Sequence, residues 1–413
     1  MRRLIFVLVA IVLIAFGCQT APTTLLPLPT RAVAAVLPPT ATDDVPATFT
    51  PPPETAVPHS TTTPFRNTRI PTETPLPIPT NTPVTPTLTP TKTPTPAPEV
   101  QTTATPVIKP IDEYGPYEII PYEAFPTPPG DNGWGMHWMP NTSQDQGIVD
   151  RFVAEMVKMH IKWVVFLNDG TDIGSNDYLV DKLVASGIMP VMRLYRSGVL
   201  AYDGNIYEMV THYRAKGVYY YQLYNEPNVN VENHQGFANP TQYAQAWAAS
   251  ARSVISAGGL PGIGAFSPGG AYDHNEFLAR TLQALDYNGE SHLLNHAWLS
   301  VHNYHGLRAF DDPGGFLLFR EYDEIVRSHI GRSLPMIGTE GGSYSADPHV
   351  ETQFIAHHYT YMRDAEPYFL AYSTWLLANR EGGHYDESWE WQTLFRAGYI
   401  HPAVTDFFYK NNR

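Results

Sequence analysis

The sequence predicts an α/β fold: a closed barrel of eight parallel strands alternating with helices, a (β/α)8 or TIM barrel, preceded by a disordered linker rich in proline and threonine. Two observations support this prediction. Short apolar runs bounded by turns recur eight times beyond residue 130, with helical patterns between them. Two of these runs are followed directly by a glutamate, Glu226 or Glu340, and barrels of this kind carry their active sites at such strand ends.

The first 18 residues have the features of an export signal. Met1-Arg2-Arg3 is basic, and the apolar run from Leu4 to Gly17 is shorter than the roughly 20 residues that a spanning helix needs. Gly17-Cys18 resembles the junction at which bacterial lipoproteins are cleaved and lipidated. The resemblance implies lipidation of Cys18 and an extracytoplasmic, cell-surface lipoprotein, or a secreted protein if the lipid anchor is not used. An uncleaved membrane anchor and an ordinary signal with an incidental cysteine are the alternatives.

Residues 19–112 are predicted to form a stalk without packed structure. The stretch from Pro83 to Pro90 is typical of its composition, which alternates proline with threonine and almost lacks aromatic residues. Such a segment cannot build a core, and proline favours extended polyproline conformations. Because Cys18 is the only cysteine, intrachain disulfides are excluded, and stability outside the cell must come from the packed core of the remaining residues.

Residues 113–413 are predicted to form one domain. All 8 tryptophans lie beyond position 130, and the segment is only modestly longer than the roughly 250 residues of a plain eight-unit barrel. The net charge of -14 argues against nucleic acid or an anionic membrane as a partner. We therefore expect a monomer that touches the membrane only through its N-terminal lipid.

The strands of the barrel are expected where apolar, aromatic and β-branched residues cluster. The clearest helix between them runs from Pro240 to Ala257, where Asn239 can cap the first turn and Pro240 takes the first helical position.

Glu226 and Glu340 are 114 residues apart. If they follow strands four and seven, each strand and helix unit has about 38 residues, against a minimum of roughly 30. The eight expected strands are Trp134–Trp138, Lys162–Leu167, Met189–Leu194, Val218–Tyr224, Ile263–Phe266, Trp298–Asn303, Pro335–Gly338 and Phe369–Leu376.

The two glutamates suit the cleavage of a glycosidic bond. This reaction needs a carboxylic acid that protonates the leaving oxygen and a carboxylate that attacks the anomeric carbon. Glu226 is the candidate acid/base and Glu340 the candidate nucleophile, while Asn225 could hydrogen-bond the sugar 2-hydroxyl. A single glutamate after a strand is more often a solvated loop charge or an ion-pair partner. Two glutamates at this spacing favour the catalytic interpretation.

The motifs around these residues resemble those of the clan A glycoside hydrolases, in particular its cellulase and mannanase group. Those barrel enzymes carry an Asn-Glu-Pro string after strand four and the nucleophile glutamate after strand seven, as Asn225-Glu226-Pro227 and Thr339-Glu340-Gly341 would here. His302-Asn303-Tyr304 is similar to the His-x-Tyr of that group, and Trp375 stands where the group has a tryptophan under the cleaved sugar. The resemblance implies a retaining β-glycosidase that acts on polysaccharides or oligosaccharides by double displacement and needs no cofactor.

Some positions depart from that group. It has an arginine at the end of the second strand and a histidine at the end of the third. In this chain the second strand ends Phe166-Leu167-Asn168-Asp169 and the third ends Arg193-Leu194-Tyr195. We expect Arg193, on the third strand, to take the arginine's part beside the nucleophile. At the end of the first strand, His137 and Trp138 are further candidates for contact with the substrate.

Two other functions fit parts of the sequence. His296, His302, His305 and the pair His357-His358 could indicate a metal-dependent hydrolase, since imidazole is a common zinc ligand. Their spacing matches no metal motif, and we expect no metal. The second alternative is a non-catalytic, surface-tethered barrel that binds glycan without cutting it. Which glycan would be bound or cleaved, and whether from within or from its ends, is not encoded in a recognisable motif.

Overall fold

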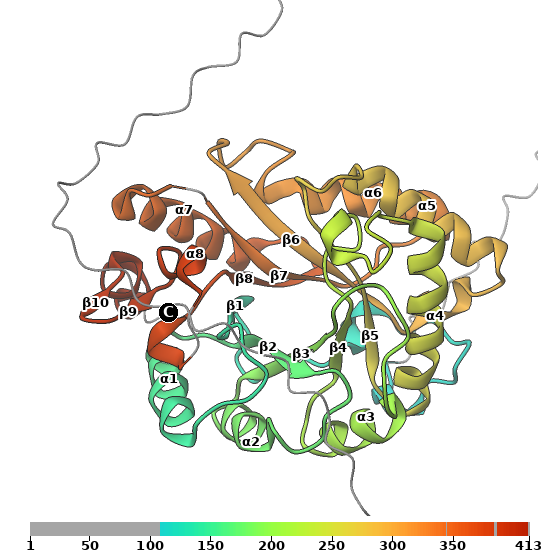
Figure 1. The fold of residues 1–413 in the computed structure, drawn as a ribbon, viewed down its shortest axis with the longest axis horizontal. Helices are drawn as coiled ribbons and strands as arrows, with labels where there is room; N and C mark the ends of the chain where they lie inside the picture. The colour runs from blue at the N-terminus through green and yellow to red at the C-terminus, as the bar shows by residue number, and fades with distance from the viewer. Residues whose placement is uncertain (1–107, 344, 384–385, 412–413) are drawn as a thin grey trace, which may run out of the picture. The chain divides into compact units, whose positions relative to one another are not determined.

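The protein, as a computed structural model, is described for residues 108–343, 345–383 and 386–411. The expected signal peptide with Cys18, and the expected stalk up to residue 107, lie outside these residues. The described chain forms a closed barrel of eight parallel strands in the order of the sequence, ringed by helices (Figure 1). The (β/α)8 fold class is therefore confirmed. Among the described residues, no helix combines the length and the apolar character that crossing a membrane requires.

Each strand pairs with the next one along the chain, and β8 closes the barrel on β1. All eight expected strands are present. Two of them, β6 and β7, continue several residues beyond their expected ends, because their glycine-rich ends still pair with each other, as in the register of Asn303 with Gly341. The strands are β1 (Trp134–His137), β2 (Trp163–Asp169), β3 (Met189–Tyr195), β4 (Tyr220–Leu223), β5 (Leu260–Phe266), β6 (Trp298–Gly306), β7 (Met336–Ser343) and β8 (Phe369–Thr374).

The helices between the strands begin at clear sequence signals. In α4 the Asn239 side chain accepts hydrogen bonds from the backbone of Thr241 and Gln242, and Pro240 is the first helical residue, as predicted. Aspartates cap α1, α5 and α7 in the same way. The helices are α1 (Gln146–Lys158), α2 (Asp177–Ala185), α3 (Ile206–Ala215), α4 (Pro240–Ser256), α5 (His274–Tyr287), α6 (Phe319–Ile330) and α7 (Pro348–Tyr361).

The segment after β8 departs from the regular alternation. It contains the short helix α8 (Glu387–Glu390) and a two-stranded hairpin, β9 (Phe395–Arg396) and β10 (Tyr399–Ile400). Figure 1 shows α8, β9 and β10 beside α7, at the edge of the barrel. The hairpin is joined to the end of β8 by a bridge between Ala378 and Phe395. This segment thus adds walls around the carboxyl ends of β7 and β8.

The amino-terminal end of the barrel is closed by the segment that precedes β1. Ile120 and Phe125 are buried against Trp163, Tyr220 and Trp298, which fill the base of the barrel from its strands. A larger apolar cluster packs the outer faces of the strands against the helices. The folded part already includes the short 3-10 helix at Ile111–Glu113, at the position where the domain was expected to begin. With the base filled, the open end lies at the carboxyl ends of the strands.

Candidate active site

The carboxyl ends of the strands surround a cleft of about 790 Å³. Most of the residues expected in the site line it: Arg193 from β3, Asn225 and Glu226 after β4, Tyr304 from β6, Glu340 from β7, and Trp375 after β8. Glu232, Asp386 and Trp389 also contribute to its walls, although they were not among the predicted site residues. The two carboxylates thus meet in one cleft, although 114 residues separate them along the chain.

Glu340 lies on β7 and is held by donors on both oxygens. Its Oε1 accepts a hydrogen bond from Arg193 Nη1 at 2.5 Å, and its Oε2 accepts one from the Tyr304 hydroxyl at 2.9 Å. The residue is only 6% exposed. Burial raises the pKa of Glu340, but the charges of His302 and Arg193 and the Tyr304 hydrogen bond outweigh it and lower the pKa overall. Arg193 therefore lies beside the nucleophile candidate, at the position expected for it.

Glu226 has different surroundings, in the loop after β4. Its backbone has a φ of 38°, in the left-handed region, which costs about 1–3 kcal/mol for a residue with a side chain. Neighbouring hydrogen bonds hold this conformation: the Glu226 N–H donates to the Ala265 carbonyl at 2.9 Å, and Asn228 bonds Ser267 through both its amide nitrogen and its oxygen. The Glu226 side chain is 21% exposed and faces the cleft.

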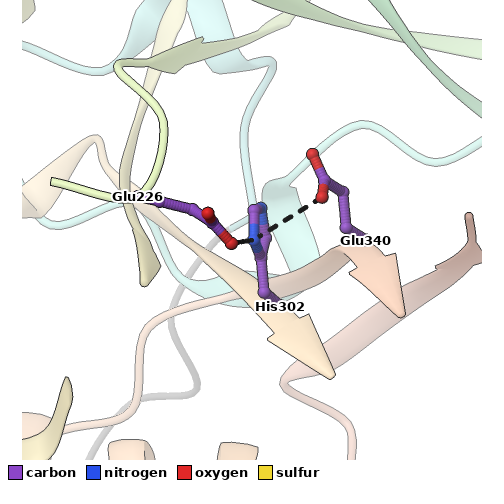
Figure 2. A group of neighbouring side chains, drawn as sticks. All are labelled: Glu226, His302 and Glu340. Atoms are coloured by element: carbon purple, nitrogen blue, oxygen red, sulfur yellow. Dashed lines mark hydrogen bonds and ion pairs between the residues drawn. The ribbon is translucent and has the colours of Figure 1, made fainter. Parts of the chain in front are cut away.

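His302 lies between the two carboxylates (Figure 2). Its Nδ1 is 3.0 Å from Glu226 Oε1 and 3.7 Å from Glu340 Oε2. The imidazole is fully buried. Burial lowers the pKa of His302, but the charge of Glu340 and the hydrogen bond and charge of Glu226 more than compensate and raise it. His302 was expected to touch the substrate, yet it lies beneath the cleft, where it can position both carboxylates.

The two residues expected to bind substrate at the end of β1 are also buried. His137 Nδ1 donates to the Trp138 carbonyl at 3.1 Å, because a carbonyl can only accept, and its ring packs on Trp375 at 4.4 Å between centroids. Its Nε2 is 4.0 Å from Glu340 Oε1. Burial lowers the pKa of His137 to about 4, which keeps the ring neutral at physiological pH. His137 thus packs beneath Trp375, and its unprotonated Nε2 faces Glu340 without a hydrogen bond.

Trp138 requires a correction. It is fully buried outside the barrel, with its ring against Phe152 of α1 at 6.4 Å, and it does not line the cleft. Successive residues at a strand end point to opposite faces of the sheet. Because His137 points to the inside of the barrel, Trp138 must point to the helices, so it is a core residue and not a sugar platform.

Glu232 adds a third carboxylate to the cleft. It ends the short 3-10 helix η3 (Asn230–Glu232), and its carboxylate accepts a hydrogen bond from the Asn225 side chain. Burial and the charges of Glu226 and Glu340 raise the pKa of Glu232, against the opposing charge of Arg193. Asn225, expected to bind the sugar 2-hydroxyl, is therefore oriented by Glu232. No motif in the loop sequence marks this contact.

One group of possible metal ligands occurs among the described residues. One donor atom each from Glu226, His302 and Glu340 lies within 4.8 Å of the others. Both oxygens of Glu340, however, already accept hydrogen bonds, one of them from the guanidinium of Arg193, whose charge repels a cation. The other histidines considered as ligands do not join this group. His296 bonds the Gly115 carbonyl, and His305 and His358 pack against each other.

Comparison with known proteins gives only distant similarities. No model of a known protein family matches the chain, and no curated protein matches it. Among solved structures, the chain is similar to a β-glucuronidase of Bacteroides uniformis, with 12% identity and a TM-score of 0.45. The match covers 69% of this chain but only 37% of the β-glucuronidase. An endo-β-1,4-mannanase of Thermotoga petrophila has 12% identity and a TM-score of 0.42 over 68% of this chain and 78% of its own. An endo-β-1,4-glucanase of Xanthomonas axonopodis pv. citri has 11% identity and a TM-score of 0.43 over 66% of this chain and 92% of its own.

Proposed function

We propose that the protein is a retaining glycoside hydrolase that cleaves β-glycosidic bonds in polysaccharides or oligosaccharides, with Glu226 as acid/base and Glu340 as nucleophile. The observation that carries the proposal is the pair of carboxylates that line one cleft, Glu226 with the more exposed side chain and Glu340 with a lowered pKa. The two residues arrive there from strand ends three units apart in the barrel. The chemistry needs no metal or cofactor, because both proton transfer and nucleophilic attack are supplied by side chains.

The spacing of the carboxylates supports retention of configuration. One oxygen of Glu226 lies within 4.8 Å of one oxygen of Glu340. Retaining enzymes place the two carboxyl groups about 5–5.5 Å apart, whereas inverting enzymes need roughly 6.5–9.5 Å to hold a water between them. A direct attack by Glu340 on the anomeric carbon therefore fits the cleft better than attack by an activated water.

The surroundings of each carboxylate suit its proposed role. Glu340, with donors on both oxygens and a lowered pKa, stays ionised and attacks the anomeric carbon as the bond to the leaving oxygen breaks. Glu226 donates its proton to that oxygen, and afterwards accepts one from the water that releases the sugar from Glu340. His302 bonds Glu226 at 3.0 Å and can hold its carboxyl in place for both steps.

An activity screen on a glycan panel tests the proposal. The panel should include β-linked glucans, mannans, xylans and galactans and cell-wall glycans, with release of reducing ends as the readout. For any substrate that is cut, NMR spectroscopy of the first product should detect the β anomer before mutarotation. Hydrolysis with initial release of the α anomer would exclude retention. Binding without release of reducing ends would favour the alternative, a non-catalytic glycan-binding barrel.

The proposed enzyme works outside the cytoplasm, as a monomer held at the cell surface by a lipid on Cys18. The proposal rests on the basic start, the apolar run and the single cysteine of the sequence. Mass spectrometry of membrane-extracted protein should find an N-terminus with a lipid at Cys18, and Cys18→Ala should release the protein or block its processing. Soluble wild-type protein that begins at Thr20 or later without a lipid would contradict the anchor.

A further inference from the structure

A second cavity adjoins the cleft behind Trp375. It has a volume of about 150 Å³ and lies between the first half of α7, the end of β7 and the hairpin β9–β10. Trp375 and Gln392 line both the cavity and the cleft, so the two share a wall. The volume is room for on the order of ten water-sized atoms, which is close to the size of one sugar unit. None of the steps proposed for Glu226 and Glu340 uses this cavity.

One wall of the cavity offers hydrogen-bonding groups, and one of their atoms, Glu351 Oε2, has no partner. Glu351 of α7 accepts a hydrogen bond from the backbone N–H of Ser343, but its Oε2 is buried and has no partner. Burial raises the pKa of Glu351 to about 7, so near neutral pH this carboxyl can both donate and accept. His401 accepts the Ala403 N–H at Nδ1, which leaves its Nε2 as the protonated nitrogen and a donor. A buried carboxylate oxygen such as Glu351 Oε2 normally has a partner.

The remaining walls are aromatic. Trp391 is 40% exposed and Tyr399 is 36% exposed, and both line the cavity together with Trp375. The guanidinium of Arg396 lies over the Tyr399 ring, 5.0 Å from its centroid. Faces of large aromatic rings next to hydroxyl, carboxyl and imidazole groups suit a ligand with apolar faces and a rim of hydroxyls. A pyranose ring has this character, and the mixed charges of Glu351 and Arg396 favour a neutral one.

We propose that this cavity is a subsite for one neutral sugar unit of the substrate, placed across Trp375 from the cleaved bond, so that the preferred glycan is branched or bent at that point. The inference rests on the proposed function, because it assumes that the cleft holds a glycan. It narrows the substrate class: a straight, unsubstituted chain would leave the cavity empty, while a side branch near the sugar above Trp375 could fill it.

Variants of the aromatic wall test the subsite. Trp391→Ala and Tyr399→Ala remove partly exposed rings that line the cavity and not the cleft, and Glu351→Leu removes the unpartnered oxygen. Tyr287→Ala, at a residue of α5 that is 92% exposed, is the matched control. On branched oligosaccharides we expect KM to rise about tenfold or more in the aromatic variants. With an aryl β-monoglycoside, which fills only the cleft, kcat/KM should be unchanged.

Two outcomes separate the failure of the subsite from the failure of the proposed function. If the wild type cuts glycans but the variants retain its KM on every branched and linear substrate, the subsite is wrong and the enzyme stands. If the wild type cuts nothing, the same oligosaccharides are titrated calorimetrically into the full-length protein. Binding that is lost in Trp391→Ala would then support the subsite without catalysis, and absence of binding to the wild type would overturn both.

Discussion

The ends of β4 and β7 each supply a glutamate to the cleft, but they hold it in different ways. Glu340 is part of β7, its side chain is 8% exposed, and it receives hydrogen bonds on both oxygens from Arg193 and Tyr304. Glu226 lies beyond the end of β4, in a loop with left-handed backbone, and its side chain is 21% exposed, with Nδ1 of His302 at 3.0 Å from its Oε1. The same residue type is thus a fixed anion at one strand end and an accessible carboxyl at the other.

In the proposed mechanism, the depth of each carboxylate and the number of its hydrogen-bond donors distinguish the two roles. A nucleophile must be ionised and aimed at one atom, so donors on both oxygens serve it. An acid/base must reach the leaving oxygen, lose its proton and regain one from water, so it needs access to the cleft and fewer fixed donors. His302 contacts both residues and couples the two ends of the site. Changes at the two positions should therefore have different kinetic signatures.

The largest effect is expected at the end of β7. Glu340→Ala removes the group that we propose forms the covalent intermediate, and we expect turnover of every substrate to fall by roughly 10⁴-fold or more. Steady-state kinetics on a natural glycan and on an aryl glycoside measure the loss. Glu324→Ala, at an exposed residue of α6, is the control and should be within about twofold of the wild type. Substantial activity of Glu340→Ala on both substrates would exclude Glu340 as nucleophile.

A smaller and selective effect is expected at the end of β4. Glu226→Ala should reduce hydrolysis of natural glycans by about 10²–10⁴-fold, because their leaving oxygen needs a proton. Aryl glycosides whose leaving group departs unprotonated should still form the intermediate, and added azide should release it as a product of retained configuration. If activity on both substrate types falls by the same factor and azide does not restore it, Glu226 is not the acid/base.

The sequence predicted these two positions because strand ends follow from hydrophobic runs, and the strand order places the fourth and seventh ends in one rim. The sequence did not predict how deeply each side chain lies below the open end of the barrel. His302 and Tyr304 are two residues apart on β6, so their side chains point to the same side of the strand. His302, the earlier of the two, is nevertheless buried between the carboxylates, whereas Tyr304 lines the cleft. The sequence pattern of the strand does not distinguish a buried position such as that of His302 from a position in the cleft such as that of Tyr304.

Residues outside the regular strands were harder to predict. Glu232 reaches Asn225 only because the loop after β4 turns through a 3-10 helix, and such a turn leaves no periodic signal. The prediction for Trp138 was wrong although the sequence held enough information. Adjacent strand residues point to opposite faces, so with His137 inside the barrel Trp138 had to point to the helices. Glu351 and the hairpin that forms the second cavity depend on contacts between α7 and the last described segment.

Removing one donor to Glu340 should shift the pH dependence by a moderate amount. The Tyr304 hydroxyl helps to lower the pKa of Glu340, so in Tyr304→Phe that pKa should rise. Since Glu340 acts ionised, the acid limb of the profile of kcat/KM should move to higher pH, and activity should be lost earlier as the pH falls. A hydrogen bond to a charged group contributes about 1.5–3 kcal/mol, which corresponds to roughly 1–2 pH units.

The control for this shift is Tyr287→Phe, on the exposed face of α5. Its pH profile should coincide with that of the wild type. If Tyr304→Phe loses activity at all pH values by the same factor, without movement of the acid limb, the tyrosine acts on the substrate and not on the ionisation of Glu340. That result would weaken the view that the donors at the end of β7 define the nucleophile.

The smallest effect is expected from removal of metal ions. This experiment tests whether Glu226, His302 and Glu340 act as acid/base, positioning residue and nucleophile, or whether they bind a metal ion. A divalent ion at this group would need deprotonated His302, whose pKa is instead raised, and would approach the guanidinium that is 2.5 Å from Glu340 Oε1. Dialysis against a chelator, followed by assay in metal-free buffer, should therefore leave kcat and KM unchanged. Activity lost on dialysis and restored by added Zn²⁺ would replace the two-carboxylate mechanism with metal-assisted hydrolysis. The contrast between β4 and β7 would then reflect ligand geometry.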